Sequence, residues 1–264
     1  MDHRPRKRFG QNFLHDPGTI RRLLAAVAPR PGERLVEIGP GRGALTRGLL
    51  EAVGELDVVE LDRDLIAPLA QDLGDLGSLR IHNADALAFD LCALATEGRR
   101  LRLIGNLPYN ISTPLLFRFI EQADCLADMH LMLQREVVER IAAAPGGKAY
   151  GRLSVMVQAY CRAETLVRIG PGAFTPAPKV ESAFLRLVPY RPLPHPIRDP
   201  ARLARLVAQA FSQRRKTLRN SLKGLIPIEL LADCGVDPAQ RAEELPVATF
   251  IRLANTACNL SPLP

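Results

Sequence analysis

The chain has 264 residues, of which 47% are apolar and 24% charged, values typical of a soluble globular protein with room for one large domain and a small second one. No apolar run approaches the roughly 18 residues needed to cross a bilayer, and no apolar stretch follows the basic N-terminus, so neither a membrane span nor a secretory signal is expected. The net charge of +7 is concentrated at the two ends of the chain, with +3 on residues 1–8, −1 on residues 9–190 and +5 on residues 191–264. This distribution favours a polyanionic partner, although basic arms that only aid solubility are the alternative.

The five cysteines are widely spaced and form no C-x-x-C motif. Their spacing supports neither a disulfide framework nor a zinc site, so a reducing cytoplasm and the absence of a metal are expected.

From about residue 33, short apolar runs alternate with segments whose apolar residues recur every three or four positions. This alternation predicts βαβ units and a parallel sheet. The expected strands are residues 34–38, 57–61, 79–82, 101–105 and 129–133. Helical periodicity is clearest over residues 44–52 and 65–73. Two later apolar runs, 156–160 continuing to 169 and 183–188, lack an intervening helix and predict a hairpin that closes one edge of the sheet.

Residues 189–200 hold five prolines, which predicts a linker. Asp199 and Pro200 are suited to the N-cap and first turn of a helix, and Gly224 is a plausible end for it. Further helices are expected at 228–234 and 246–257. The predicted organisation is a catalytic domain over residues 1–190 with a basic N-terminal arm, a linker over 191–198 and a helical domain over 199–264.

A glycine-containing loop, Gly39-Pro40-Gly41, follows the first predicted strand. Glu60 ends the next strand, 21 residues after Gly39, where a carboxylate can accept hydrogen bonds from both hydroxyls of a ribose. This combination predicts an adenosine-containing cofactor. A dinucleotide enzyme and a simple tight turn are alternatives, because the loop also fits the Gly39-x-Gly41-x-x-Ala44 fingerprint. Asp85, after the third strand, is placed either to accept from an adenine amine or to cap a helix.

The segment Asn106-Leu107-Pro108-Tyr109 follows the fourth predicted strand. The N6 amine of adenine is a poor nucleophile because its lone pair is delocalised into the ring. The side-chain oxygen of Asn106 and the backbone carbonyl of Leu107 could accept its two hydrogens and so localise that lone pair. Pro108 would stiffen the loop, and Tyr109 would stack on the base. The competing interpretation is an ordinary turn.

Taken together, these motifs resemble those of the ribosomal RNA adenine N6-dimethyltransferase family. The resemblance implies a Rossmann-like α/β fold, with a seven-stranded class I methyltransferase sheet, a small C-terminal all-helical domain and S-adenosyl-L-methionine as the cofactor, released as S-adenosyl-L-homocysteine. Residues 9–14 are similar to the family segment that closes over the cofactor, and residues 174–182 to the substrate-side loop. The implied cofactor-binding residues are Gln11, Asn12, Leu14, Gly39, Gly41, Glu60, Leu61, Asp85, Ala86 and Asn106. The implied catalytic residues are Asn106, Leu107, Pro108, Tyr109 and Phe174, the last as the second face of the base sandwich.

Within the family, residues 211–222 resemble the C-terminal helix of the bacterial small-subunit members, and no acidic residue interrupts the stretch 211–223. Arg215, Arg219 and Lys223 follow at four-residue spacing, which predicts three cations on one helix face for phosphates, or else a solvated charged face. The expected RNA-binding residues are Arg4, Arg6, Lys7, Arg8, Arg214, Arg215, Lys216, Arg219 and Lys223. By this resemblance the chain dimethylates two adjacent adenosines near the 3′ end of 16S rRNA, within an immature small ribosomal subunit. A monomer is the default expectation, which the resemblance does not supply.

Three other classes of protein share parts of this pattern. A sibling enzyme that methylates one adenine of large-subunit RNA shares the motifs, and a non-catalytic nucleic-acid-binding factor can share the fold. DNA adenine methyltransferases usually carry an acidic residue and two prolines where this chain has Asn106-Leu107-Pro108-Tyr109.

Overall fold

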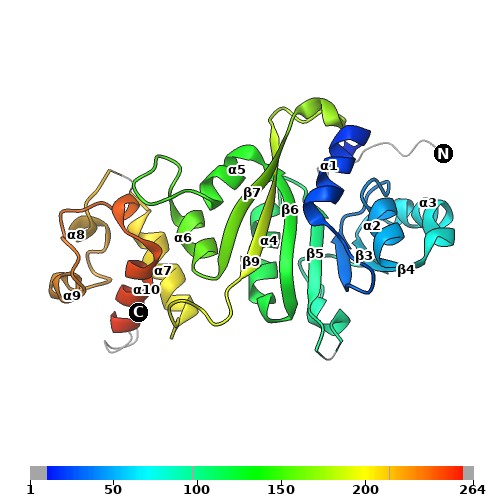
Figure 1. Ribbon diagram of the computed structural model, residues 1–264. Helices are drawn as coiled ribbons and strands as arrows, with labels where there is room; N and C mark the ends of the chain where they lie inside the picture. Colours follow the sequence, from blue (N-terminus) through cyan, green and yellow to red (C-terminus); the bar gives the residue numbers. More distant parts are fainter. Residues whose placement is uncertain (1–10, 97, 214, 258–264) are drawn as a thin grey trace. The chain divides into compact units, whose positions relative to one another are not determined.

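The computed structural model describes residues 11–96, 98–213 and 215–257. Its main element is a seven-stranded sheet with the order β4-β3-β2-β5-β6-β9-β7 (Figure 1). The strands are β2 (Leu35–Ile38), β3 (Glu55–Glu60), β4 (Ser78–Asn83), β5 (Leu101–Asn106), β6 (Leu126–Gln134), β7 (Cys161–Ile169) and β9 (Ser182–Pro189). The strands from β4 to β6 are parallel, and β9 runs antiparallel to β6 between β6 and β7. Both the predicted parallel sheet and the predicted hairpin at its edge are confirmed.

The prediction of a strand over residues 156–160 is wrong, because the chain forms helix α6 (Arg152–Gln158) there. The backbone amide of Gly151 donates a hydrogen bond to the Ser154 hydroxyl, which fixes the first turn of this helix. Residues 155–157 are all buried, and a short, wholly apolar run does not distinguish a buried helix from a strand.

One face of the sheet carries the helices α1 (Pro17–Val27), α2 (Thr46–Val53) and α3 (Arg63–Leu73), whose apolar sides join a single buried cluster with side chains of the strands. Helix α1 begins where the Asp16 carboxylate accepts a hydrogen bond from the Thr19 amide at 2.6 Å. The helices α4 (Ser112–Glu121) and α5 (Arg135–Ile141) follow β5 and β6. Two short strands, β1 (Phe13–Leu14) and β8 (Phe174–Thr175), pair antiparallel and bring the start of the described chain beside the segment before β9.

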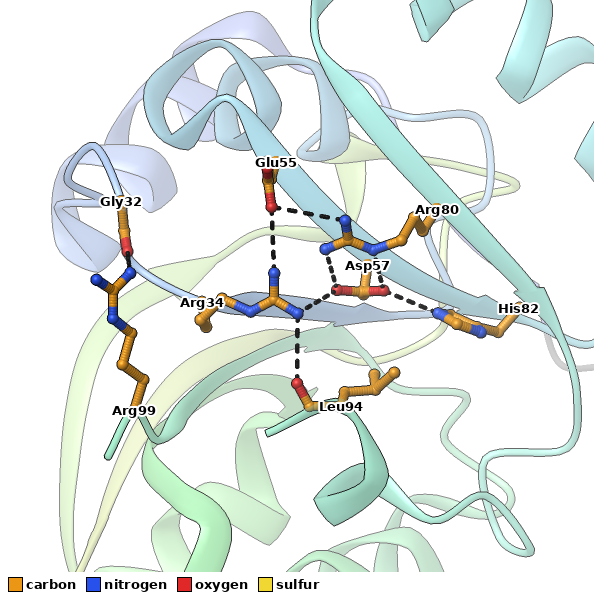
Figure 2. Close-up of polar contacts among 8 residues, drawn as sticks. All are labelled: Gly32, Arg34, Glu55, Asp57, Arg80, His82, Leu94 and Arg99. Atoms are coloured by element: carbon orange, nitrogen blue, oxygen red, sulfur yellow. Dashed lines mark hydrogen bonds and ion pairs between the residues drawn. The ribbon is translucent and has the colours of Figure 1, made fainter. Parts of the chain in front are cut away.

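A polar network lies on β3 and β4 and at the amino end of β2 (Figure 2). The buried carboxylate of Asp57 on β3 accepts two hydrogen bonds of 2.9 Å from the Arg80 guanidinium and lies 2.9 Å from His82 Nε2. Arg34 approaches the same carboxylate at 3.5 Å. Burial acts to raise the pKa of Asp57, but these hydrogen bonds and positive charges outweigh it and leave the pKa below its ordinary value. Since Arg80 and His82 belong to β4, the network fastens this edge strand to the sheet.

Contacts divide the chain into two compact units, and residues 139–163, which the prediction placed in the catalytic domain, belong to the second. The first unit comprises residues 1–138 and 164–189, and the second comprises residues 139–163 and 190–264. The second unit contains α6 together with α7 (Pro200–Ala210), α8 (Leu218–Ser221), α9 (Ile228–Asp233) and α10 (Val247–Ala257). Asp199 caps α7 by accepting from the Arg202 amide at 2.9 Å, as predicted. Within this unit the hydroxyl of Tyr150, before α6, donates to the Leu245 carbonyl at 2.8 Å.

The cysteines differ from the expectation of no disulfide, because Cys92 and Cys125 are joined in one. The spacing of the cysteines along the sequence does not reveal this bond, because a third residue, Gln122, brings the segments of Cys92 and Cys125 together. Its side-chain oxygen accepts from the Leu91 amide at 2.7 Å, and its carbonyl accepts from the Cys125 backbone amide at 3.3 Å. Cys161 and Cys234 are buried free thiols, and Cys258 lies outside the described residues. Among the described helices, none has the length and apolarity that crossing a bilayer requires.

Candidate active site

A cavity of about 300 Å³ opens at the carboxyl ends of β2, β3 and β5, where ligands bind in parallel α/β sheets. Every residue predicted to bind the cofactor lines this cavity, and so do four of the five predicted catalytic residues. The predicted residues that line it are Gln11, Asn12, Leu14, Gly39, Gly41, Glu60, Leu61, Asp85, Ala86, Asn106, Leu107, Pro108 and Tyr109. Segments from residues 11 to 109 thus converge on one cavity, which is the geometry that the motifs predicted.

The glycine loop between β2 and α2 has a backbone conformation that residues other than glycine rarely adopt. Gly39 and Gly41 have φ values of 65° and 58°, and the Gly39 amide donates to the Val59 carbonyl at 2.9 Å. A Cβ on Gly41 would lie 3.0 Å from the ring of Phe13, over which the Arg42 guanidinium also sits at 4.8 Å. The loop and the segment around Phe13 therefore close on each other with no room for a side chain at Gly41.

Backbone amides orient the Glu60 carboxylate at the end of β3. Its two oxygens accept from the Asp62 amide at 2.8 Å and the Gly41 amide at 3.3 Å. Burial raises the pKa of Glu60, against the lowering effect of these hydrogen bonds. Leu61 follows with 46% of its surface exposed, an unusual value for a large apolar side chain and one that offers an apolar surface at the cavity. Asp85 accepts from the Leu87 amide at 2.9 Å in a turn rather than capping a helix.

Glu37 on β2 also lines the cavity, and it was not among the predicted site residues. It is buried, and its Oε2 has no hydrogen-bond partner among the described residues. Burial raises the pKa of the Glu37 carboxyl to about 7, with the nearby Thr46 hydroxyl opposing the shift and the Glu60 carboxylate adding to it. The sequence carried a signal for this residue, because an acidic side chain inside a four-residue apolar strand that runs into a glycine loop is unusual.

The side-chain amide of Asn106 has a defined orientation. Its Nδ2 donates to the backbone carbonyl of Asn12 at 3.1 Å. Only the nitrogen of the amide can donate to a carbonyl, so Oδ1 is left as the acceptor. The carbonyls of Pro108 and Tyr109 already accept from the Ile111 amide and the Ser112 hydroxyl. The Leu107 carbonyl has no donor within the described part of the chain, so Asn106 Oδ1 and this carbonyl form a pair of acceptors at the cavity.

The two aromatic residues predicted to sandwich the base are placed differently. Tyr109 lines the cavity, and its hydroxyl lies 2.5 Å from the Ser182 hydroxyl. Burial raises the pKa of Tyr109, and the hydrogen bond with Ser182 opposes this. Phe174 is 2% exposed within the core cluster and is not among the residues that line the cavity. Its backbone pairs with Leu14, so the structure places Phe174 beside the cavity wall, and its stacking role stays a prediction.

The basic stretch of residues 211–223 does not form the single helix that was expected. Helix α7 ends at Ala210 and α8 covers only Leu218–Ser221, so Arg215, Arg219 and Lys223 do not share one helix face. The chain breaks here because the first amides of α8, those of residues 218 and 219, donate to the carbonyls of residues 240 and 238 at 2.8 and 3.0 Å. The described basic side chains of this stretch are all exposed, namely Arg215, Lys216, Arg219 and Lys223. The remaining predicted RNA-binding residues, Arg4, Arg6, Lys7, Arg8 and Arg214, lie outside the described residues.

Comparison with known proteins adds independent evidence. Residues 2–258 match the family model described as ribosomal RNA adenine dimethylase. The chain is 57% identical to the ribosomal RNA small subunit methyltransferase A of Pseudomonas aeruginosa over 98% of this chain and 96% of that protein. It is 56% identical to the protein of the same name from Nitrosococcus oceani, over 96% of each.

Solved structures share the fold. A dimethyladenosine transferase from Plasmodium falciparum superposes with a TM-score of 0.81 at 23% identity, covering 94% of this chain and 98% of that one. The 23S rRNA methyltransferase ErmE superposes with a TM-score of 0.70 at 24% identity, covering 92% and 98%. The sheet order, the converging motifs and the match over almost the whole sequence agree, and the chain therefore belongs to the ribosomal RNA adenine dimethylase family.

Proposed function

We propose that the protein transfers methyl groups from S-adenosyl-L-methionine to the N6 amine of adenine in small-subunit rRNA. The proposed product is N6,N6-dimethyladenosine at two adjacent positions near the 3′ end of 16S rRNA, formed on an immature small subunit in the cytoplasm. The observation that carries the proposal is the single cavity lined by the glycine loop, Glu60, Asp85 and the segment Asn106–Tyr109. High identity to proteins named small subunit methyltransferase A supports the choice of subunit.

The residues of the cavity fit an adenosine cofactor that carries a methionine tail. Glu60 holds a carboxylate, oriented by backbone amides, at the position where a ribose needs acceptors. Gly41 lets the loop close against the Phe13 ring at the cavity, where a Cβ would lie only 3.0 Å from that ring. The unpartnered Oε2 of Glu37 offers an acceptor for a cationic group such as the cofactor's ammonium. Bound there, S-adenosyl-L-methionine would supply a methyl group on a sulfonium, an electrophile that needs no metal ion.

The chain's own contribution to catalysis would be to position and polarise the target amine. Asn106 Oδ1 and the Leu107 carbonyl would accept its two hydrogens, which localises the nitrogen lone pair toward the methyl group. The hydrogen bond from Asn106 Nδ2 to Asn12 supports this role, because it keeps the amide from flipping. Tyr109 would stack on the base, and alignment of the reacting atoms would supply most of the rate enhancement.

The exposed basic residues of the helical unit are proposed to bind backbone phosphates. Arg215, Lys216, Arg219 and Lys223 are spread over a turn, a short helix and the segment after it, so they would follow a curved phosphate chain rather than lie along one helix face. Contacts of this kind place an RNA without reading its sequence, and shape would then select the substrate.

The test is methyl transfer from radiolabelled S-adenosyl-L-methionine to purified, unmethylated 30S and 50S particles, followed by nucleoside analysis. Dimethyladenosine in 16S rRNA with inert 50S particles is the expected result. Label in the 50S particles would favour the large-subunit activity instead, and label in neither would refute the proposed reaction.

Asn106→Ala tests the proposed chemistry within the site. Removing the acceptor should abolish turnover while cofactor binding, followed by calorimetry, persists. Weakened cofactor binding with normal residual turnover would contradict this role for Asn106.

A further inference from the structure

Ser182 is the residue in the described chain that holds the free end of the Tyr109 side chain. The two hydroxyl oxygens lie 2.5 Å apart, although the residues are 73 positions apart in the sequence. Ser182 is the first residue of β9 and is fully buried. It pairs with Gln134 at the end of β6, so its backbone belongs to the sheet and not to the loop of Tyr109.

Two further contacts fix the position of Ser182 independently of the cavity. The Arg135 amide donates to the carbonyl of Glu181 at 2.9 Å, and the side chains of the same two residues form an ion pair. The strand that carries Ser182 is thus anchored both along the β6–β9 ladder and at the residue before it.

Tyr109 is consequently held at both ends. The hydroxyl of Ser112 donates to the Tyr109 carbonyl at 3.2 Å, which fixes the backbone of the catalytic segment. Ser182 fixes the phenol oxygen at the opposite end of the side chain. With both ends fixed, the ring cannot swing about its Cα–Cβ bond, so its position at the cavity beside Asn106 is set before any base arrives.

We infer that Ser182 is a positioning residue for base methylation, acting through its hydrogen bond to Tyr109 to fix the ring on which the target adenine stacks. This inference rests on the proposed function, because it takes the stacking role of Tyr109 from it. Ser182 itself is buried behind the tyrosine and is not among the residues that line the cavity.

A double-mutant cycle with Ser182→Ala, Tyr109→Phe and the combined variant tests the inference. Phenylalanine keeps the ring and loses only the hydroxyl, so each single variant removes the same hydrogen bond from one side. A hydrogen bond of this kind corresponds to a rate effect of about three- to tenfold. We expect each single variant to lower kcat on 30S particles by about that factor, the double variant to be no slower than either, and the KM for S-adenosyl-L-methionine to stay unchanged.

Ser154→Ala is the matched control. Ser154 is also fully buried, and both it and Arg140, whose carbonyl accepts from its hydroxyl, belong to the second unit. Its effect on kcat should be independent of Tyr109→Phe, even if it lowers the melting temperature as much as Ser182→Ala does. Additive effects of Ser182→Ala and Tyr109→Phe, or a Ser182→Ala enzyme with normal kcat, would overturn the inference. An inert wild-type enzyme would refute the proposed function, whereas an active wild type with additive variants would refute only the role of Ser182.

Discussion

Replacing Glu37 by glutamine should change how the stability of the protein depends on pH. The folded protein holds this carboxyl at a pKa of about 7, against an ordinary value of 4.5, so folding favours the protonated form. A raised pKa contributes stability that is complete below pH 4.5 and is lost as the pH rises through 7. Glutamine resembles the neutral acid in size and polarity and cannot ionise. The Glu37→Gln variant should therefore keep, at high pH, the folding stability that the wild type loses.

The magnitude follows from the two pKa values. Their difference, at about 1.4 kcal/mol per pH unit, corresponds to about 3 kcal/mol. His130 acts in the opposite direction, because burial lowers its pKa to about 4, against the partial opposition of Asp128. The contribution of His130 to the free energy of unfolding therefore increases as the pH rises from 4 to 6.5. The two effects oppose each other in the wild type, so the comparison is made between each variant and the wild type at the same pH.

Urea unfolding of the wild type and Glu37→Gln at several pH values between 4 and 8 measures the effect. The free energy of unfolding of the variant, relative to the wild type, should rise by about 3 kcal/mol across this range. His130→Asn is the control, and its difference from the wild type must change with pH in the opposite sense. A Glu37→Gln difference that stays level within about 1 kcal/mol would refute the raised pKa of Glu37.

Three further predictions concern the loop, the basic stretch and the disulfide. Gly41→Ala should weaken S-adenosyl-L-methionine binding about tenfold by calorimetry, because its methyl would lie 3.0 Å from the Phe13 ring at a φ of 58°; unchanged affinity would contradict the tight closure. Arg219→Ala should lower the slope of log affinity against log salt for 30S particles by about 1 in filter binding, and an unchanged slope would remove this residue from the phosphate contacts. Cys92→Ser should lower stability by about 4 kcal/mol relative to the oxidised wild type and by little relative to the reduced one, because the bond to Cys125 closes a loop of 33 residues. Equal melting curves for the oxidised wild type and the variant would argue against the bond.

The cavity could be predicted from the sequence because local rules determine it. In a parallel sheet the carboxyl ends of the strands share one edge, so Gly39, Glu60 and Asn106 had to meet once their strands were recognised. Glu37 was missed although its strand was predicted, because its significance depends on which face of the strand is buried beneath the loop.

Features that depend on distant residues could not be predicted. The contact between Tyr109 and Ser182 follows from the register of β9 against β6, which no local pattern encodes. The helix expected around Arg215 has the composition of a helix, yet its amides bond to residues 238 and 240 instead. In the basic stretch, long-range hydrogen bonds therefore overrode a local helical preference.

The second unit is assembled from two stretches of chain that are separated by a hairpin of the first unit. Residues 139–163 provide α6 and the Tyr150 hydroxyl bonded to the Leu245 carbonyl, and residues 190–264 provide the other helices. A fragment cut at the proline-rich linker would leave the buried side of α7 and α10 without α6, with apolar residues exposed to water. The helical unit is therefore not a detachable tail, and during synthesis it can close only after the strands of the hairpin have left the ribosome.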